Sequence, residues 1–308
     1  MPHRRTFLKT ALFLSSLESI AAITKPQQMP EHKNFSLKIL ATNWGFNGSL
    51  NDFLTKSKKE GYDGVEMWWP MKENDQKELF ELLKKHQLDV GFLAGAYQTD
   101  FTEHLNHFKS MVQAAATNKM QTPLYINCHS GKDFFTAEQN QAFIDYTTKT
   151  VKETGILICH ETHRSRMLYA APIARQYMER NKDLHITADF SHWCNVHESL
   201  LQDQPQTMQL AMERTRHIHA RVGHSQGPQV NDPRAPEWEG ALKAHLNWWD
   251  QIAAQAKKRG DRLTILTEFG PPDYMPTTPY TRQPLADQWA INVHMMQLLR
   301  KRYGGSSL

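Results

Sequence analysis

The amino-acid sequence predicts an α/β protein that folds as a single-domain closed (β/α)8 barrel, the TIM barrel. From residue 35 onward, short apolar runs alternate about eight times with segments of helical character. Continuously apolar runs are typical of parallel strands that helices cover on both faces. Each strand and helix unit spans roughly 30 to 45 residues, which matches the size of such a barrel. Four of the runs also stop abruptly at a polar residue, namely Glu161, Asp189, His219 and Glu268.

The elements can be placed in order along the chain. The predicted strands occupy residues 37–44, 62–69, 88–97, 124–129, 156–163, 184–189, 217–222 and 262–268. The predicted helices occupy residues 49–61, 73–87, 101–120, 136–155, 171–181, a part of 198–214, 241–259 and 285–302. Ser49 with Asp52 and Thr136 with Gln139 have the spacing of a capping box, which marks a helix start. Lysines followed by a glycine close the first and the seventh helix, so the joins to the next strands are short.

Composition narrows the class of protein. The 308 residues are 40% hydrophobic and 22% charged, as in an ordinary globular chain. The formal net charge of +4 is small and no basic stripe is evident, so we expect no nucleic-acid partner. Beyond the N-terminal segment no long charge-free apolar stretch occurs, so we expect no stable membrane insertion. Three cysteines without a C-x-x-C spacing argue against a disulfide framework and favour small buried side chains.

The first 34 residues differ from the rest of the chain. Residues 3–9 are basic and residues 11–17 are apolar, which is the pattern of an export signal. The pair Arg4-Arg5 resembles a twin-arginine signal, a bacterial export address. We therefore expect residues 1–34 to be an export signal and short linker, with cleavage near Ala21, and residues 35–308 to be a periplasmic barrel. A frayed basic tail is the alternative, because Glu18 interrupts the apolar run.

The polar residues at the strand ends predict a metal site. The carboxyl ends of the strands converge on one face of a (β/α)8 barrel, where active sites are built. Side chains alternate along a strand, so Glu161, Asp189, His219 and Glu268 can all point inward. Three carboxylates and one imidazole suit Mn²⁺, Mg²⁺ or Co²⁺ and, less readily, Zn²⁺. Separate ion pairs are the alternative, with partners at Arg164, Arg166 or Arg221.

Two long loops fall on the same face. Residues 223–240 and 270–284, which follow the seventh and eighth strands, are Pro-rich. Long loops in a compact domain are usually functional.

The strand-end motifs resemble those of the xylose-isomerase-like barrels. These motifs are C-H-E-T-H around Glu161, D-x-x-H from Asp189, H-I-H ending at His219 and L-T-E-F-G around Glu268. The resemblance implies that these four residues bind one divalent metal ion, and that Glu161 and Glu268 act as acid and base on opposite faces of the substrate. It also implies that His192 contacts a substrate hydroxyl. The expected activity is that of an isomerase or epimerase of a sugar or keto-sugar through a metal-stabilised enediolate. Export favours a non-phosphorylated carbohydrate.

Further polar residues lie near the same face. The ketose epimerases of this superfamily have an arginine in the loop after the seventh strand. Here Arg221 is predicted on the strand, followed by His224, and either residue is a candidate for substrate contact. For His129 and His163, substrate contact and support of the metal ligands are both open. For Glu66 we expect a buried structural hydrogen bond. Core packing is the plainer interpretation for Trp44, Trp68 and Trp69, and stacking on a sugar ring is the alternative. Strand parity predicts that His160 points away from the metal.

Three alternatives remain. The same site can serve a lyase or dehydratase acting on a keto-sugar or keto-glycoside. A nuclease like endonuclease IV needs histidines at the second and third strand ends, where this chain has none. A non-catalytic carbohydrate-binding barrel is the third alternative. The sugar, the native metal and the oligomeric state stay open.

Overall fold

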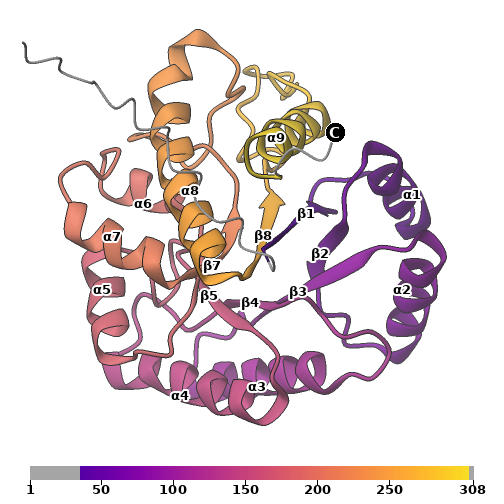
Figure 1. Cartoon of the computed structure of the whole chain (residues 1–308), viewed down its shortest axis with the longest axis vertical. Coiled ribbons are helices and arrows are strands. Elements are labelled where there is room, and N and C mark those ends of the chain that lie inside the picture. Colours follow the sequence, from indigo (N-terminus) through magenta and orange to yellow (C-terminus); the bar gives the residue numbers. More distant parts are fainter. Residues whose placement is uncertain (1–34, 305–308) are drawn as a thin grey trace, which may run out of the picture. The chain divides into compact units, whose positions relative to one another are not determined.

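The computed structural model describes residues 35–304, and its strands close a parallel barrel in sequence order (Figure 1). This confirms the predicted fold class. The strands are β1 (Ser36–Thr42), β2 (Gly64–Trp68), β3 (Asp89–Gly95), β4 (Ile126–His129), β5 (Ile158–Glu161), β6 (Ile186–Ala188), β7 (Thr215–His219) and β8 (Arg262–Thr267). β1 pairs with β8 over six residue pairs, from Ser36 opposite Arg262 to Ala41 opposite Thr267, and this closes the ring.

Helices surround the barrel on its outside (Figure 1). They are α1 (Leu50–Glu60), α2 (Glu73–His86), α3 (Phe101–Thr117), α4 (Ala137–Thr154), α5 (Ala171–Arg180), α6 (Phe190–Val196), α7 (Pro205–Arg214), α8 (Glu239–Arg259) and α9 (Gln288–Tyr303), with a 3₁₀ turn η1 (Pro236–Trp238). Both predicted capping boxes form, at Ser49 before α1 and at Thr136 before α4. Gly61 ends α1 with a left-handed backbone (φ 94°) that L-residues rarely adopt, so the chain can turn at once into β2.

The structure corrects the prediction around two strands. The seventh strand was predicted to run to residue 222, but β7 ends at His219 because the amide of Arg221 turns back to the carbonyl of His219 (3.0 Å). Arg221 therefore lies beyond the strand. The short helix α6 was not predicted; it starts directly after β6, where the side chain of Asp189 accepts a hydrogen bond from the amide of Ser191 (3.2 Å).

Two apolar layers support the barrel. The larger lies between the sheet and the helices and includes Ile39 and Ala41 of β1. The residue between them, Leu40, belongs to a separate cluster with Tyr125 and Leu266, because side chains alternate across the strand. The three cysteines are buried and free, as expected. Within residues 35–304 no helix has the length and apolar character to cross a bilayer.

Candidate metal centre

Four strand ends bring the predicted metal ligands together. Glu161 and His219 are the last residues of β5 and β7, and Asp189 and Glu268 directly follow β6 and β8. One potential ligand atom from each residue lies within 4.8 Å of the others. All four residues are buried, and Glu268 is the most exposed at 8%. Strand parity thus predicts their placement correctly, while the role of these residues as ligands stays a prediction.

The arrangement of donor atoms fits a cation. Nδ1 of His219 lies 2.9 Å from Oε2 of Glu268 and 3.6 Å from Oε2 of Glu161. Nevertheless, Nδ1 of His219, Oε2 of Glu268 and Oε1 of Glu161 make no hydrogen bond, although all three atoms are buried. Buried polar atoms are nearly always paired, so potential metal-ligand atoms that lack a hydrogen bond and lie within 4.8 Å of one another fit a shared cation. The carboxylate oxygens suit Mn²⁺, Mg²⁺ or Co²⁺.

Glu66 of β2 supports His219 from within the barrel. Its Oε1 lies 3.2 Å from Nε2 of His219, and its Oε2 accepts from the hydroxyl of Tyr125 (2.7 Å) and lies 3.1 Å from Nε2 of His217. Burial alone would raise the pKa of Glu66, but the imidazoles of His219 and His217 outweigh burial and lower the pKa to about 2. An ionised Glu66 orients the ring of His219 through Nε2, so that Nδ1 faces the centre. The sequence interpretation of Glu66 as a hydrogen-bonded structural residue agrees with these contacts.

Arg221 lies beside the centre and pairs with Asp189. Its Nη2 contacts Oδ2 of Asp189 and Nε2 of His192 (2.8 Å), and it lies 3.6 Å from Oε2 of Glu268. The guanidinium is fully buried, and the ring of Tyr274 packs on it with a centroid distance of 4.6 Å. The ion-pair alternative therefore holds for Asp189.

The other two arginines, Arg164 and Arg166, form no ion pair with Glu161 or Glu268 among the described residues. Arg164 donates to the side chain of Asn195 (3.3 Å) and Arg166 to the carbonyl of Ala96 (2.9 Å). Burial lowers the pKa of His219, but Glu268, Glu66 and Glu161 outweigh burial and raise this pKa well above its usual value. One guanidinium and one imidazole thus serve three carboxylates and Glu66, and burial of the remaining negative charge is costly unless a cation compensates it.

Three imidazoles form a row over the carboxylates. Nε2 of His129 lies 2.8 Å from Oε2 of Glu161. The ring of His163 lies between the other two, with centroid distances of 4.8 Å to His129 and 4.0 Å to His192. Burial lowers the pKa of His163 to about 3, and repulsion from His129 adds to this effect, so His163 is neutral near pH 7. Neutral imidazoles can accept or donate hydrogen bonds to substrate hydroxyls.

Other predicted residues lie elsewhere. His160 points away from the centre, as strand parity predicts, and hydrogen-bonds to Ser130 (2.7 Å) and Thr147 (2.8 Å). The ring of His224 packs against Trp238 with a centroid distance of 4.7 Å, and the His224 backbone pairs with Gly227 in a tight turn. Trp69 is a core residue packed on Phe92.

Sequence reasoning missed two residues. Asn127 of β4 donates to Oε2 of Glu161 (2.7 Å) from a fully buried position. The sequence feature that could have identified Asn127 is its polar side chain within an otherwise apolar strand, two residues before His129. Tyr274, from the loop at 270–284, packs on Arg221 and on Trp44 (centroid distance 4.9 Å). The length of that loop was the available signal, but it did not single out the tyrosine.

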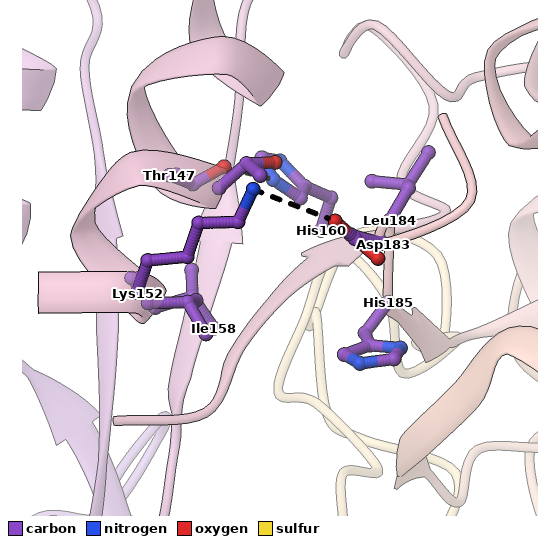
Figure 2. A pocket seen from close by; sticks show the side chains of 9 residues that line it. Thr147, Lys152, Ile158, His160, Asp183, Leu184 and His185 are labelled. Carbon is purple, nitrogen blue, oxygen red and sulfur yellow. Dashed lines mark hydrogen bonds and ion pairs between the residues drawn. The ribbon is translucent and has the colours of Figure 1, made fainter. Parts of the chain in front are cut away.

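A separate cavity opens at the opposite ends of the strands. Figure 2 shows its lining by Thr147 and Lys152 of α4, His160 of β5, and Asp183 and His185 before β6. Its volume is about 250 Å³, and Lys152 pairs with Asp183 across it at 3.8 Å. In (β/α)8 barrels this face serves stability rather than chemistry.

Fold and centre together define a (β/α)8 barrel with a carboxylate and imidazole group at the carboxyl ends of its strands. No protein-family model and no curated protein matches the sequence. Solved structures do match. The chain is similar to the 3-keto-D-glucoside 4-epimerase YcjR of E. coli in its apo form, with 16% identity, a TM-score of 0.58, and coverage of 86% of this chain and 100% of that one.

Two further structures are similar over the same share of the chain. A D-tagatose 3-epimerase-like protein has 12% identity and a TM-score of 0.59, covering 86% of this chain and 96% of that one. The probable 3-DHS dehydratase AsbF of Bacillus anthracis has 15% identity and a TM-score of 0.53, covering 86% and 99%. At these identities the likeness establishes the fold, and fold alone does not fix function.

Proposed function

We propose that this protein is a divalent-metal-dependent isomerase or epimerase of a non-phosphorylated sugar or keto-sugar. The observation that carries the proposal is the meeting of Glu161 and Glu268 at one imidazole nitrogen of His219. Their strands, β5 and β8, stand three places apart in an eight-stranded ring, so the two carboxylates approach the centre from different sides. Two carboxylates on different sides of one carbon can remove a proton and return it.

The residues of the chain divide the work as follows. One of Glu161 and Glu268 takes the proton from the carbon beside the substrate carbonyl, and the other returns a proton to that carbon. Asp189 and His219 complete the donor set, and a divalent cation held there supplies positive charge beside the substrate oxygens that gain electron density. His163 and His192 offer neutral imidazoles to hydroxyl groups, and Arg221 orients Asp189.

Two expectations about the cellular setting belong to the proposal. The similar solved structures named as sugar epimerases support a carbohydrate substrate. The basic and apolar segments at residues 3–17 support export to the periplasm, although they lie outside the described residues. An exported enzyme would meet non-phosphorylated sugars.

Metal analysis and isotope exchange test the proposal. Purified protein is expected to contain one divalent ion per chain by mass spectrometry of the metals. It is also expected to exchange a carbon-bound proton of a ketose or keto-glycoside with D₂O, followed by NMR. Glu161→Gln and Glu268→Gln each remove a proton-transfer group, so each is expected to slow exchange about 10²-fold or more. Glu78→Gln, on the exposed side of α2, is the matched control. Protein that binds no divalent ion, with exchange unaffected by both substitutions, would refute the proposal.

The same experiment separates the alternatives. A lyase or dehydratase uses the same proton abstraction, but its substrate then loses a group from the neighbouring carbon. The likeness to the probable dehydratase AsbF supports this alternative. The NMR spectrum then shows an unsaturated product in place of a deuterated epimer. A carbohydrate-binding barrel shows binding without exchange.

A further inference from the structure

Trp68 lies across the end of a neighbouring strand at the mouth of the barrel. Trp68 ends β2, and Gly95 ends β3 beside it. A Cβ atom at position 95 would lie 3.4 Å from Cη2 of Trp68 and 2.9 Å from Cβ of His129. Gly95 therefore allows the close approach of His129 on β4, and the indole of Trp68 lies in van der Waals contact beside it.

A continuous row of rings connects the candidate metal centre with solvent. His129 contacts Glu161 at 2.8 Å, and the indole of Trp68 meets the His129 ring edge to face with a centroid distance of 5.4 Å. Tyr97, just past β3, continues the row with a centroid distance of 5.8 Å to Trp68. Tyr97 is 68% exposed, so the row of rings ends at the surface. Trp68 and Tyr97 are called the aromatic wall below.

In the aromatic wall, Tyr97 has one guanidinium near its ring, that of Arg166 at 5.5 Å from the centroid. The second aromatic pair at the mouth lies closer to charged groups. Tyr274 lies near two guanidinium groups, 4.6 Å from Arg221 and 4.9 Å from Arg164 to the ring centroid. Trp44 packs on Tyr274 and is 36% exposed. This pair covers the charged residues of the centre, whereas the aromatic wall extends beyond His129 and ends in an exposed ring.

We propose that the aromatic wall is an accessory subsite that binds the second ring of a glycoside while the first ring lies at Glu161 and Glu268. The inference rests on the proposed carbohydrate function and specifies its substrate class as a glycoside instead of a free monosaccharide. Aromatic faces carry partial negative charge and attract the C–H groups on the apolar face of a sugar ring. The subsite follows His129 in the row of rings that leads from Glu161 to the surface, so we expect it to contact the part of a substrate beyond the first ring. A planar aromatic aglycone would use the same stacking chemistry.

Binding measurements on matched sugar pairs test the subsite without requiring turnover. Calorimetry compares glucose with cellobiose and with phenyl β-glucoside, and galactose with lactose, on the full-length metal-loaded protein. We expect cellobiose or lactose to bind about fivefold or more tightly than its monosaccharide, and Tyr97→Ala and Trp68→Ala to bring that ratio to about one. Trp68→Phe keeps an aromatic face and is expected to retain most of the ratio. Met120→Ala removes a side chain that is 61% exposed in the loop before β4, at the other end of the barrel, and is the control.

Saturation-transfer NMR gives a second readout that a merely structural role would not change. Protons of the second ring are expected to receive saturation from the wild-type protein and to lose it in Tyr97→Ala, an exposed site where folding is not at risk. In the calorimetry, tighter binding of cellobiose or lactose than of its monosaccharide supports a second sugar ring as the occupant. Tighter binding of phenyl β-glucoside alone overturns the proposal in favour of an aromatic aglycone. Equal affinity within every pair, or no binding of any glycoside, also overturns the proposal. Glu161→Gln separates the subsite from the proposed reaction, because it is expected to slow exchange about 10²-fold or more while the ratio of glycoside to monosaccharide affinity stays the same.

Discussion

Glu66 and His219 form a buried carboxylate–imidazole pair, with Oε1 of Glu66 3.2 Å from Nε2 of His219. The opposite ring nitrogen, Nδ1, faces Glu268 at 2.9 Å. The pair fixes the orientation of the imidazole, with one ring nitrogen toward Glu66 and the other toward Glu268. Such partners of metal-binding histidines contribute strongly to metal affinity although they do not touch the metal.

Replacement of Glu66 by glutamine is therefore expected to weaken metal binding. Glu66→Gln keeps the shape of the side chain but removes the charge that makes Nδ1 of His219 basic, so the affinity for Mn²⁺ should fall about 10- to 100-fold. Competition with a fluorescent chelator measures this change, and Glu78→Gln on the exposed side of α2 is the control. Unchanged affinity would show that Glu66 serves packing alone.

Loss of Arg221 is expected to destabilise the metal-free protein. Arg221→Met leaves the fully buried carboxylate of Asp189 without its ion-pair partner. Removal of one member of a buried pair typically lowers the free energy of unfolding by about 3–5 kcal/mol. Urea denaturation in the presence of EDTA measures the effect. Asp189→Asn in the same chain removes the unpaired charge and should recover part of the loss; a double variant that recovers nothing contradicts this account.

Gly270 is expected to be required for the position of Trp44. A Cβ atom at position 270 would lie 2.3 Å from Cη2 of the indole, so Gly270→Ala forces the ring to move and should lower stability by about 1–3 kcal/mol. Trp44→Ala in the same chain relieves the clash, so the two effects should not add. Thermal denaturation of the single and double variants measures the coupling. Gly240→Ala is the matched control, since a Cβ there meets nothing within 4 Å.

The stability of the barrel is expected to fall in acid through His160. Burial lowers the pKa of His160 from 6.5 to about 3, and repulsion from His185 adds to this effect. Below pH 6.5 the unfolded chain takes up a proton that the folded chain refuses until about pH 3. The His160 contribution to stability is therefore complete above pH 6.5 and is lost as the pH falls toward 3, at up to about 1.4 kcal/mol per pH unit.

His160→Gln removes this proton uptake. The free energy of unfolding, measured in urea at a series of pH values between about 6 and 4, should then depend less steeply on pH, by about one proton. Identical slopes for both proteins would mean that His160 is protonated in the folded state.

Features that depend on residues close together in the sequence could be predicted, and features that depend on distant residues could not. The capping residues Ser49 and Thr136 act on amides three residues away, so both helix starts could be read locally. The end of β7 could not, because Arg221, just past that strand, makes its buried contact with Asp189, 32 residues away in the sequence. Asn127 and Tyr274 were missed for the same reason, since their partners lie in other strands and loops.

The sequence by itself determined the barrel and the residues that end its last four strands. The apolar period and the strand parity are properties of neighbouring residues, and the parallel order places equivalent strand ends on one face. Only the tertiary structure decided which side chains surround those ends. It paired Glu66 with His219 and Arg221 with Asp189, and it laid Trp68 over Gly95, because each of these contacts joins residues whose separation in space no local pattern encodes.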